Sequence, residues 1–393
     1  MDKILVINSG SATLKFKVFS LPNLVEEAVG IVERIGIDGS FIVVKSNGSI
    51  TNKKFRAGLK NHGEAFEQVI SALKKYLPEI KIVAHRVVHG GTQFTEATLV
   101  DNIKINELKK FNYLAPLHNP INIMCIEQAL RLLPEAKEYA VFDTDYYKSM
   151  PEYACLYALP EKYNSVYGIR RYGFHGISHQ YCALEAAKKL KKPIEKLKII
   201  SCHLGSGCSI TATKNGKAVD TTMGFTPLEG LTMSTRAGDL DASIPLFLIE
   251  RCKMKTEEIS ILFNKQSGLL GVAGTMDMRE ILTASGHKVY GYVMNKNFTK
   301  IEREKCTLAL KMFIYDIVRY VGQFITIMKG ADAVVFTGGI GERSPVVRNL
   351  ILKEIKFLGK IKSFVVPADE ELMMARRASL KEREFKRQKI KKS

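Results

Sequence analysis

Three Gly/Ser-rich turns, each directly after an apolar strand-like run, are the first candidates for chemistry in this sequence. They read NSGSATLK at 8–15, HLGSGCS at 203–209 and TGGIGERS at 337–344. Glycine lets backbone N–H groups approach a ligand, and serine or threonine hydroxyls add donors, so turns between strands can bind phosphate. None has the spacing of a P-loop or of a dinucleotide-binding motif. One such turn is usually an ordinary hairpin, whereas three favour a phosphorylated ligand.

Two arginines and one aspartate stand where anions could be bound. Arg86 lies in HRVVHGG and Arg236 in STRAGDLD. Guanidinium binds carboxylate or phosphate through two parallel hydrogen bonds, although an isolated arginine is more often part of a structural ion pair. Asp143 ends a strand in FDTD, where a carboxylate often faces a cleft. The alternative is that Asp143 caps a helix that begins before Tyr146.

Seven of the eight histidines fall in or beside Gly-rich or Pro-rich loops. They are His62, His85, His89, His118, His175, His179 and His203. We interpret all but His62 as polar cleft residues that donate to anionic oxygens, the alternative being satisfied core histidines. His175 and His179 have the i, i+4 spacing of a metal site, but Gly176 stands where H-E-x-x-H needs its glutamate, so zinc is not expected.

The elements that would position these residues come in two similar sets. Strands are predicted at 3–7, 14–19, 81–88 and 140–142, and again at 197–202, 209–213, 218–222 and 333–336. Helices are predicted at 64–77, 122–133 and 178–190. Both halves open with a strand, a Gly/Ser turn and a strand, which predicts a duplicated α/β domain with a cleft between the halves. Segment 308–328 is apolar but carries charges, so we expect a buried helix there.

Composition limits the class of protein. The chain has 393 residues, 46% of them hydrophobic, which excludes intrinsic disorder. Lys plus Arg is 59 against 40 Asp plus Glu, a net charge of +19 that indicates nucleic acid, a membrane surface or a phosphorylated small molecule as partner. Seven cysteines without a Cys-x-x-Cys pair argue against a disulfide framework and a zinc ribbon, and favour the cytoplasm. Met223, Met233, Cys202 and Cys208 are interpreted as core.

A series of motifs resembles the acetate kinase family, in order and at similar spacing, from Ile4 to about Arg376. The motifs are NSGSATLKF, AHRVVHGG, APLHNP, VFDT, YGIRRYGFHGISH, CHLGSG, DTTMGFTPLEGL, STRAGDLD, SGLLG, DMR, FTGGIGE and VPADEELMMAR. The resemblance implies the α/β fold of the acetate and sugar kinase, Hsp70 and actin superfamily. That fold has two ribonuclease-H-like lobes, each with a βββαβαβα core, and an interdomain active-site cleft. The first lobe would be 1–148 plus 368–393, and the second, nucleotide-binding lobe 149–367.

The implied reaction is reversible phosphoryl transfer from ATP to acetate, giving acetyl phosphate and ADP. By resemblance, the catalytic residues are Asp143, His175, Arg236 and Arg86. The acetate site would be Arg86, Val88, Leu117, His118, Phe174 and Pro227. The ATP site would be Ser11, Thr13, Lys15, His203, Leu204, Gly205, Ser206, Gly207, Asp277, Met278, Arg279, Gly339, Ile340, Gly341, Glu342 and Arg343. Asn8 and Glu370 match the positions that bind Mg²⁺, or Mn²⁺ in its place, largely through water.

Some positions depart from the family pattern. Ser206 and Arg343 each stand where the family usually has Asn, which bears on nucleotide contacts and not on the reaction. Ala242 replaces a Pro, and Asp145, Tyr146 and Tyr147 follow FDT in place of Ala-Phe-His. No catalytic Arg, His or Asp is lost, so we do not expect a pseudoenzyme.

Two alternatives stay open at this point. A propionate or butyrate kinase of the same family would differ only in the apolar pocket. A nucleic-acid-binding protein is suggested by the +19 charge and by the basic tail 380–393, but no helix-turn-helix, zinc or RNP-like pattern supports it. The resemblance implies a homodimer that acts on acetate and ATP. We expect it in the cytoplasm, with no specific nucleic acid and no membrane as partner.

Overall fold

The computed structural model describes residues 1–390, so the last three residues of the basic tail lie outside the described part. The chain divides into two compact units, one of residues 1–148 with the segment from Asp369 onward, and one of residues 149–368. Ala368, expected in the first lobe, therefore groups with the second unit. No helix in the described part is long and apolar enough to cross a membrane.

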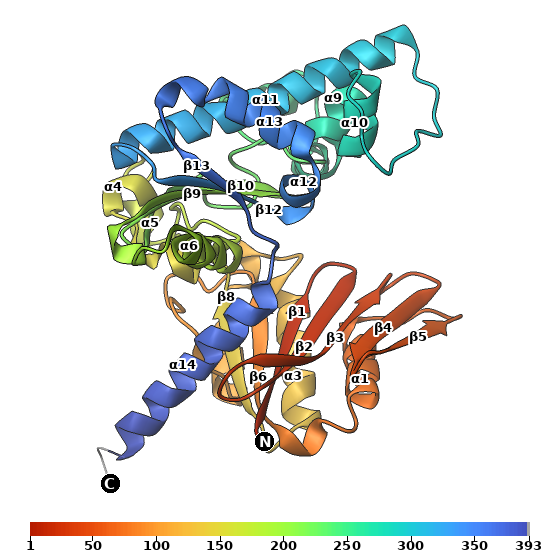
Figure 1. Cartoon of the computed structure of the whole chain (residues 1–393), viewed down its shortest axis with the longest axis vertical. Helices are drawn as coiled ribbons and strands as arrows, with labels where there is room; N and C mark the ends of the chain where they lie inside the picture. The colour runs from red at the N-terminus through yellow and green to blue at the C-terminus, as the bar shows by residue number, and fades with distance from the viewer. Residues whose placement is uncertain (391–393) are drawn as a thin grey trace. The chain divides into compact units, whose positions relative to one another are not determined.

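The first unit is built on a sheet of order β5-β4-β3-β2-β1-β6-β8-β7 (Figure 1). Its strands are β1 (Lys3–Ser9), β2 (Thr13–Ser20), β3 (Val25–Glu33), β4 (Ser40–Ser46), β5 (Ser49–Phe55), β6 (Ile80–Val87), β7 (Thr98–Leu99) and β8 (Lys137–Phe142). Its helices are α1 (His62–Ala72), α2 (Asn102–Lys109), α3 (Asn119–Leu132) and α14 (Glu370–Ile390), with 3-10 turns η1 (Leu77–Glu79), η2 (Asn112–Leu114) and η3 (Asp145–Ser149). Strands β1 to β5 are antiparallel neighbours, and β6 and β8 continue the sheet in parallel with β1.

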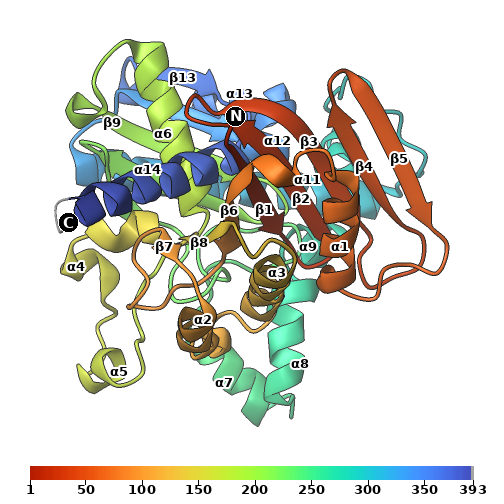
Figure 2. The ribbon, with the colours of Figure 1, turned by 90° about the horizontal axis from the view of Figure 1, so that it is seen from below.

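The alternation of side chains along β1 places helices on both faces of this sheet. Leu5 and Ile7 join the core cluster that contains Phe66 and Val69 of α1. Asn8 points to the other face, where its amide contacts Glu371 of α14. Figure 2 shows α14 on one side of β1 and β6, and α1 and α3 on the other side. The C-terminal helix thereby brings Glu370 to the carboxyl end of β1. Helix α1 ends at Ala72 and not near Leu77, because the chain makes turns at 73–76 before η1.

The second unit repeats the strand order in a sheet of order β11-β10-β9-β12-β13. Its strands are β9 (Lys198–Leu204), β10 (Cys208–Lys214), β11 (Lys217–Thr221), β12 (Ala333–Thr337) and β13 (Lys362–Val365). Its α-helices are α4 (Glu152–Cys155), α5 (Lys162–Ser165), α6 (Gly176–Leu190), α7 (Ser243–Glu250), α8 (Thr256–Ile261), α9 (Gly268–Ala273), α10 (Met278–Ala284), α11 (Lys300–Met328), α12 (Gly338–Arg343) and α13 (Pro345–Glu354). Shorter turns are η4 (Ile194–Lys196), the π-helical η5 (Leu262–Gln266) and η6 (Lys356–Leu358). The order β3-β2-β1-β6-β8 matches β11-β10-β9-β12-β13, which confirms the predicted duplication.

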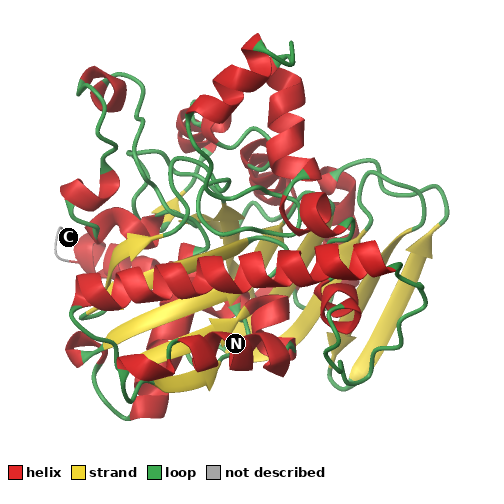
Figure 3. Cartoon of the chain, turned by 90° about the horizontal axis from the view of Figure 1, so that it is seen from above, coloured by secondary structure: helices red, strands yellow, loops and turns green. Residues whose placement is uncertain are grey.

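Helices cover the second sheet as well. Helix α6 packs its small residues Ala183 and Ala186 against Ile199 and Val335. Helix α11 lies across the strands as the long helix nearest the viewer in Figure 3. The prediction of a buried helix at 308–328 is only half right, because Phe313 is fully buried whereas Leu308 and Tyr315 are exposed. The helix is amphipathic, with an apolar patch left on its outer face.

Candidate active site

The carboxyl end of β6 carries Arg86, and the carboxyl end of β8 is followed by Asp143. The two parallel strands are neighbours, so their ends meet at one edge of the sheet. The Nε of Arg86 donates to Oδ1 of Asp143 at 3.0 Å, and Nη2 donates to Oδ2 at 2.6 Å. Arg86 therefore makes the ion pair of the alternative interpretation, and Asp143 orients its guanidinium instead of capping a helix.

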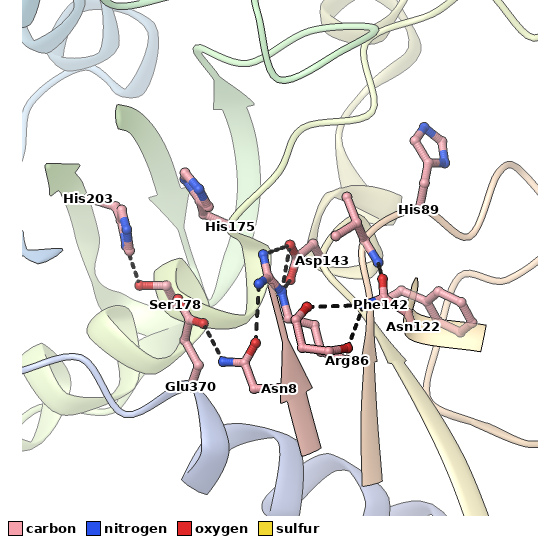
Figure 4. Close-up of polar contacts among 12 residues, drawn as sticks. Asn8, Arg86, His89, Asn122, Phe142, Asp143, His175, Ser178, His203 and Glu370 are labelled. Carbon is pink, nitrogen blue, oxygen red and sulfur yellow. Dashed lines mark hydrogen bonds and ion pairs between the residues drawn. The ribbon is translucent and has the colours of Figure 1, made fainter. Parts of the chain in front are cut away.

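Asn8 extends this pair into a polar cluster of the first unit (Figure 4). Its Oδ1 accepts from Nη1 of Arg86 at 3.2 Å, and its Nδ2 donates to Glu371 at 2.8 Å and to Glu370 at 3.2 Å. Glu371 was not predicted. Its neighbour Glu370 was assigned by resemblance, and helical backbone at the start of α14 directs both carboxylates toward Asn8. The cluster thus joins three elements that are far apart in sequence.

Burial and mutual repulsion act on the carboxylates of this cluster. Burial raises the pKa of the Asp143 carboxyl, Arg86 opposes this shift, and Glu370 adds to it. Burial also raises the pKa of Glu371, and repulsion by Glu370 adds to it. No group of three or more His, Cys, Asp or Glu in residues 1–390 is arranged to hold a metal alone. Mg²⁺ commonly uses one or two carboxylates plus water and substrate phosphate, so Glu370 and Asn8 fit that ion.

The first Gly/Ser turn links β1 and β2 as predicted. The N–H of Gly10 donates to the carbonyl of Thr13 at 2.8 Å and closes the hairpin. Lys15 is directly opposite Asn8 in the antiparallel register, so the two side chains share a face of the sheet. Lys15 and Ser11 are exposed and Thr13 is partly exposed.

Two asparagines that sequence reasoning missed fix the loop after β6. Asn122 of α3 accepts from the N–H of Val88 at 3.2 Å and donates to the carbonyl and the hydroxyl of Ser9 at 3.1 and 2.8 Å. Asn119 accepts from the N–H of His89 at 3.0 Å and donates to its carbonyl at 2.9 Å. Both side chains are fully buried. Their spacing at i, i+3 on one helix face was the available signal.

The residues assigned to the acetate pocket are divided between the units. In the first unit, Val88 is buried, Leu117 is 60% exposed, and His118 lies partly exposed directly before α3. In the second unit, Phe174 is buried and Pro227 is partly exposed.

In the second unit, the start of α6 and the end of β9 bring two predicted histidines together. The rings of His175 and His203 stack with centroids 4.4 Å apart. Nδ1 of His203 is 2.8 Å from the hydroxyl of Ser178, and Nδ1 of His175 is 2.9 Å from the hydroxyl of Ser209. His175 takes the left-handed conformation with φ 57°, and α6 begins at Gly176, two residues before the predicted start.

Arg236 approaches the same place from another loop. Its Nη1 donates to the carbonyl of Pro227 at 3.2 Å, and burial lowers its pKa. Among residues 1–390 it makes no ion pair with a carboxylate, unlike Arg86. A Cβ at Gly207 would lie 3.4 Å from Nη1 of Arg236 and 3.3 Å from Cε1 of His175. Glycine therefore lets the second Gly/Ser turn approach a desolvated cation and an imidazole, which is how a phosphate site is built.

The remaining residues assigned to nucleotide binding are placed as follows. The third turn is not a hairpin, because β12 runs directly into the short helix α12. Glu342 accepts from the backbone N–H groups of Gly338 and Ala368 at 3.0 and 2.9 Å, so its carboxylate closes the loop. Asp277 caps α10 and pairs with Arg279 at 2.6 Å. The side chains of Leu204 and Met278 are buried, which leaves their backbone for ligand contacts. Four further positions (Gly205, Ser206, Ile340 and Arg343) are partly or fully exposed, and Gly339 and Gly341 belong to α12.

Burial separates the histidines into two groups. His85, His89 and His179 are at most 1% exposed, and burial lowers the pKa of each, so interpreting these three as cleft residues was wrong. They are core histidines, as in the alternative. His118, His175 and His203, the three assigned by resemblance, are the ones that remain partly exposed. Cys202, Cys208, Met223 and Met233 are fully buried, as predicted.

Comparison with known proteins gives the family. The sequence matches the model of the Acetokinase family over residues 3–363. The chain belongs to the acetokinase family. It is 41% identical to acetate kinase of Clostridium novyi, with 95% of this chain and 97% of that protein aligned. It is 42% identical to acetate kinase of Thermoanaerobacter pseudethanolicus, with the same coverage.

Solved structures of this family have the same fold. The acetate kinase of Porphyromonas gingivalis superimposes with a TM-score of 0.84 at 37% identity, covering 97% of this chain and 99% of that one. A propionate kinase from Francisella tularensis superimposes with a TM-score of 0.87 at 34% identity, covering 97% and 100%. The architecture of two α/β lobes expected from the motifs is therefore confirmed, and the family contains kinases named for two different carboxylic acids.

Proposed function

We propose that this protein catalyses reversible phosphoryl transfer from ATP to acetate, giving acetyl phosphate and ADP. The observation that carries the proposal is Arg236, a desolvated guanidinium with no carboxylate partner in the described residues, next to His175 and the turn at Gly207. A buried cation of this kind is stabilised by an anionic ligand. The chain belongs to the acetokinase family, and relatives that are 41–42% identical to it are acetate kinases, which supports the same reaction.

The residues divide the work of phosphoryl transfer between charge neutralisation and positioning. Arg236 and His175 donate to the oxygens of the transferring group, and the turn that contains Ser206 and Gly207 holds the neighbouring phosphate. Arg86, kept in orientation by Asp143, binds the carboxylate that accepts the phosphoryl group. An acetate oxygen is already deprotonated at neutral pH, so Asp143 acts on Arg86 and need not remove a proton.

The metal belongs to the first unit in this proposal. Glu370 and Asn8 would hold Mg²⁺, and Glu371 fixes the amide of Asn8 by accepting its hydrogen. The bound ion would neutralise the charge that develops on the phosphates during transfer. Mn²⁺, which takes the same oxygen ligands, is expected to substitute for it.

The proposed substrate is acetate, with propionate as the second candidate because a propionate kinase shares the fold at a TM-score of 0.87. The bulky Val88 and Leu117 favour the smaller acid. One methylene in an apolar pocket changes selectivity by only about 1–3 kcal/mol, so we expect a preference and not an exclusion.

A steady-state substrate panel tests the proposal. Acetate, propionate and butyrate are each combined with ATP and with GTP, in the presence of Mg²⁺, and acyl phosphate is measured as the hydroxamate. We expect the highest kcat/KM for acetate with ATP. A higher kcat/KM for propionate would assign the second candidate, and no acyl phosphate from any acid with folded protein would reject both.

We also propose a cytoplasmic homodimer. All seven cysteines are free, which fits a reducing compartment. Helix α7 has no buried residue although its sequence is SIPLFLIE, and an apolar helix of this kind fits an interface between two copies of the chain.

A further inference from the structure

A chain of four side chains on α6, β9 and β10 connects the core of the second unit to His175. The hydroxyl of Ser201 is 2.7 Å from Nδ1 of His179, Nε2 of His179 is 2.7 Å from the hydroxyl of Ser209, and that hydroxyl is 2.9 Å from Nδ1 of His175. Ser201, His179 and Ser209 are each 0% exposed.

The number of hydrogens available in this series of side chains limits the directions of its three hydrogen bonds. Burial keeps His179 neutral by lowering its pKa, so the ring has one N–H and one acceptor nitrogen. Ser209 has one hydroxyl hydrogen, and its hydroxyl contacts only two imidazole nitrogens among residues 1–390. That hydrogen has an acceptor only if Ser209 donates to one nitrogen and accepts from the other. Two arrangements remain: hydrogens directed from Ser201 toward His175, or hydrogens directed from His175 toward Ser201.

Ser201 decides between them. If His179 donated from Nδ1, the hydroxyl hydrogen of Ser201 would need a different acceptor, and Ser201 has no other hydrogen-bond partner among residues 1–390. An unsatisfied buried donor is costly, which disfavours that direction. In the opposite direction Ser201 donates to Nδ1 of His179, Nε2–H of His179 donates to Ser209, and Ser209 donates to Nδ1 of His175. Every hydrogen then has an acceptor.

We propose that Ser209 and His179 are positioning residues: their hydrogen bonds hold neutral His175 in the tautomer with its hydrogen on Nε2. A Cβ at Gly207 would lie 3.5 Å from Nε2 of His175 and 3.4 Å from Nη1 of Arg236, so both atoms approach one point on the second Gly/Ser turn. Nε2–H and the guanidinium are then two donors beside one anion site. The catalytic meaning of this tautomer rests on the proposed function, whereas the tautomer itself does not.

The tautomer is measured by NMR of the whole protein with ¹⁵N-labelled histidine, at a pH where His175 is neutral. The His175 signals are assigned as those lost in His175→Gln. We expect Nε2 to show the shift of a protonated nitrogen and Nδ1 that of an unprotonated one, and Ser209→Ala to give a mixture of both tautomers. The proposal is overturned if His175 carries its hydrogen on Nδ1, or if Ser209→Ala leaves the tautomer unchanged.

Kinetics provide the second readout. Ser209→Ala is expected to lower kcat by about 10-fold, as loss of an outer-shell hydrogen bond commonly does, with both KM values within about twofold and with recovery in Ser209→Thr. Thr222→Val is the control, since it removes another fully buried hydroxyl, on the residue directly after β11, which accepts from the N–H of Ile210. Equal losses in Thr222→Val and Ser209→Ala would show a structural role only and overturn the proposal.

A second variant, at the other end of the hydrogen-bonded series, keeps the proposal testable if Ser209→Ala misfolds. If Ser209→Ala does not fold, Ser201→Ala is used, because it removes the donor that sets the direction and should also give a tautomer mixture. A single Nε2–H tautomer in Ser201→Ala would contradict the argument. An inactive wild type with the expected NMR pattern would reject the proposed function and leave the assignment of the tautomer standing.

Discussion

At the scale of single residues, the two proposed active-site arginines differ in their partners. Arg86 is held by the buried Asp143 and by Asn8, whereas Arg236 donates to a backbone carbonyl and makes no ion pair in the described part of the chain. Removing one member of a buried ion pair leaves the other charge uncompensated, and this costs more than removing an unpaired cation.

This difference predicts opposite patterns of stability and activity. Arg86→Ala should lower the free energy of unfolding by about 3–5 kcal/mol, and Arg86→Ala with Asp143→Ala should recover part of that loss. Arg236→Ala should stay within about 1 kcal/mol of wild type while kcat falls by about 100-fold or more. Urea denaturation and steady-state kinetics measure both quantities. Equal destabilisation by the two single variants would contradict the assignment.

His85 and Glu138 form a second buried pair, which predicts a dependence of stability on pH. Nε2 of His85 is 2.7 Å from Oε2 of Glu138, and both residues are about 1% exposed. Burial lowers the pKa of His85 to about 3 and raises that of Glu138 well above 4.5, so both members of the pair are neutral. Above pH 4.5 the native state keeps a proton on Glu138 that the unfolded state has lost.

Wild type should therefore lose stability relative to Glu138→Gln as pH rises above about 4.5, by at most about 1.4 kcal/mol per pH unit. The glutamine retains a donor for His85 and takes up no proton, and titration of His85 is common to both proteins. The test compares urea denaturation of the two proteins between pH 5 and 8. A difference that is constant with pH would mean that Glu138 is ionised in the folded protein.

At the scale of elements, the beginning of α3 holds the ends of two strands together. Asn122 binds Ser9 at the end of β1 and Val88 just after β6. Asn122→Ala should leave buried backbone groups unsatisfied and lower the free energy of unfolding by about 1–3 kcal/mol, with a higher KM for acetate because the loop at Val88 loosens. Glu127→Ala, on the exposed side of α3, is the control. An unchanged KM for acetate in Asn122→Ala would show that the hydrogen bonds of Asn122 do not affect substrate binding.

Local patterns predicted the elements better than the contacts between them. The Gly/Ser turns at 8–15 and 203–209 have the strand–turn–strand form expected, whereas the third leads into α12 because Gly338 takes φ +76°. The hydrogen bond from Asn122 to Ser9 joins residues 113 positions apart, and the one from Asn8 to Glu371 joins residues 363 apart. No local pattern carries such pairs. Burial, which decided between core and cleft histidines, depends on packing in the same way.

At the scale of the whole molecule, the exposed face of α7 predicts the oligomeric state. Leu246 and Phe247 are 59% and 58% exposed on this helix. Sedimentation should give the mass of two 44.0 kDa chains for wild type and of one chain for Phe247→Glu. Tyr153→Glu, at a site that is 89% exposed outside α7, should remain dimeric. Wild type with the mass of a single chain would reject the interface.

The net charge of +19 is divided among the proposed site, the basic end of α14 and the surface. Lys15, Arg86 and Arg236 are assigned to anionic reactants, and the basic end of α14 adds further charge. Most other lysines are spread over the surface, where they affect solubility and nonspecific adhesion more than a specific function. The charge alone indicated nucleic acid, a membrane surface or a phosphorylated small molecule, whereas the site residues point to phosphoryl transfer.

Phosphorus NMR of the reaction mixture tests the central claim most directly. Protein, ATP, Mg²⁺ and acetate are combined, and the γ-phosphate of ATP is followed over time. We predict that its resonance is replaced by those of acetyl phosphate and ADP in equal amounts, and that adding acetyl phosphate and ADP reverses the change. Formation of inorganic phosphate without acetyl phosphate, or an unchanged ATP spectrum with folded protein, would contradict the account.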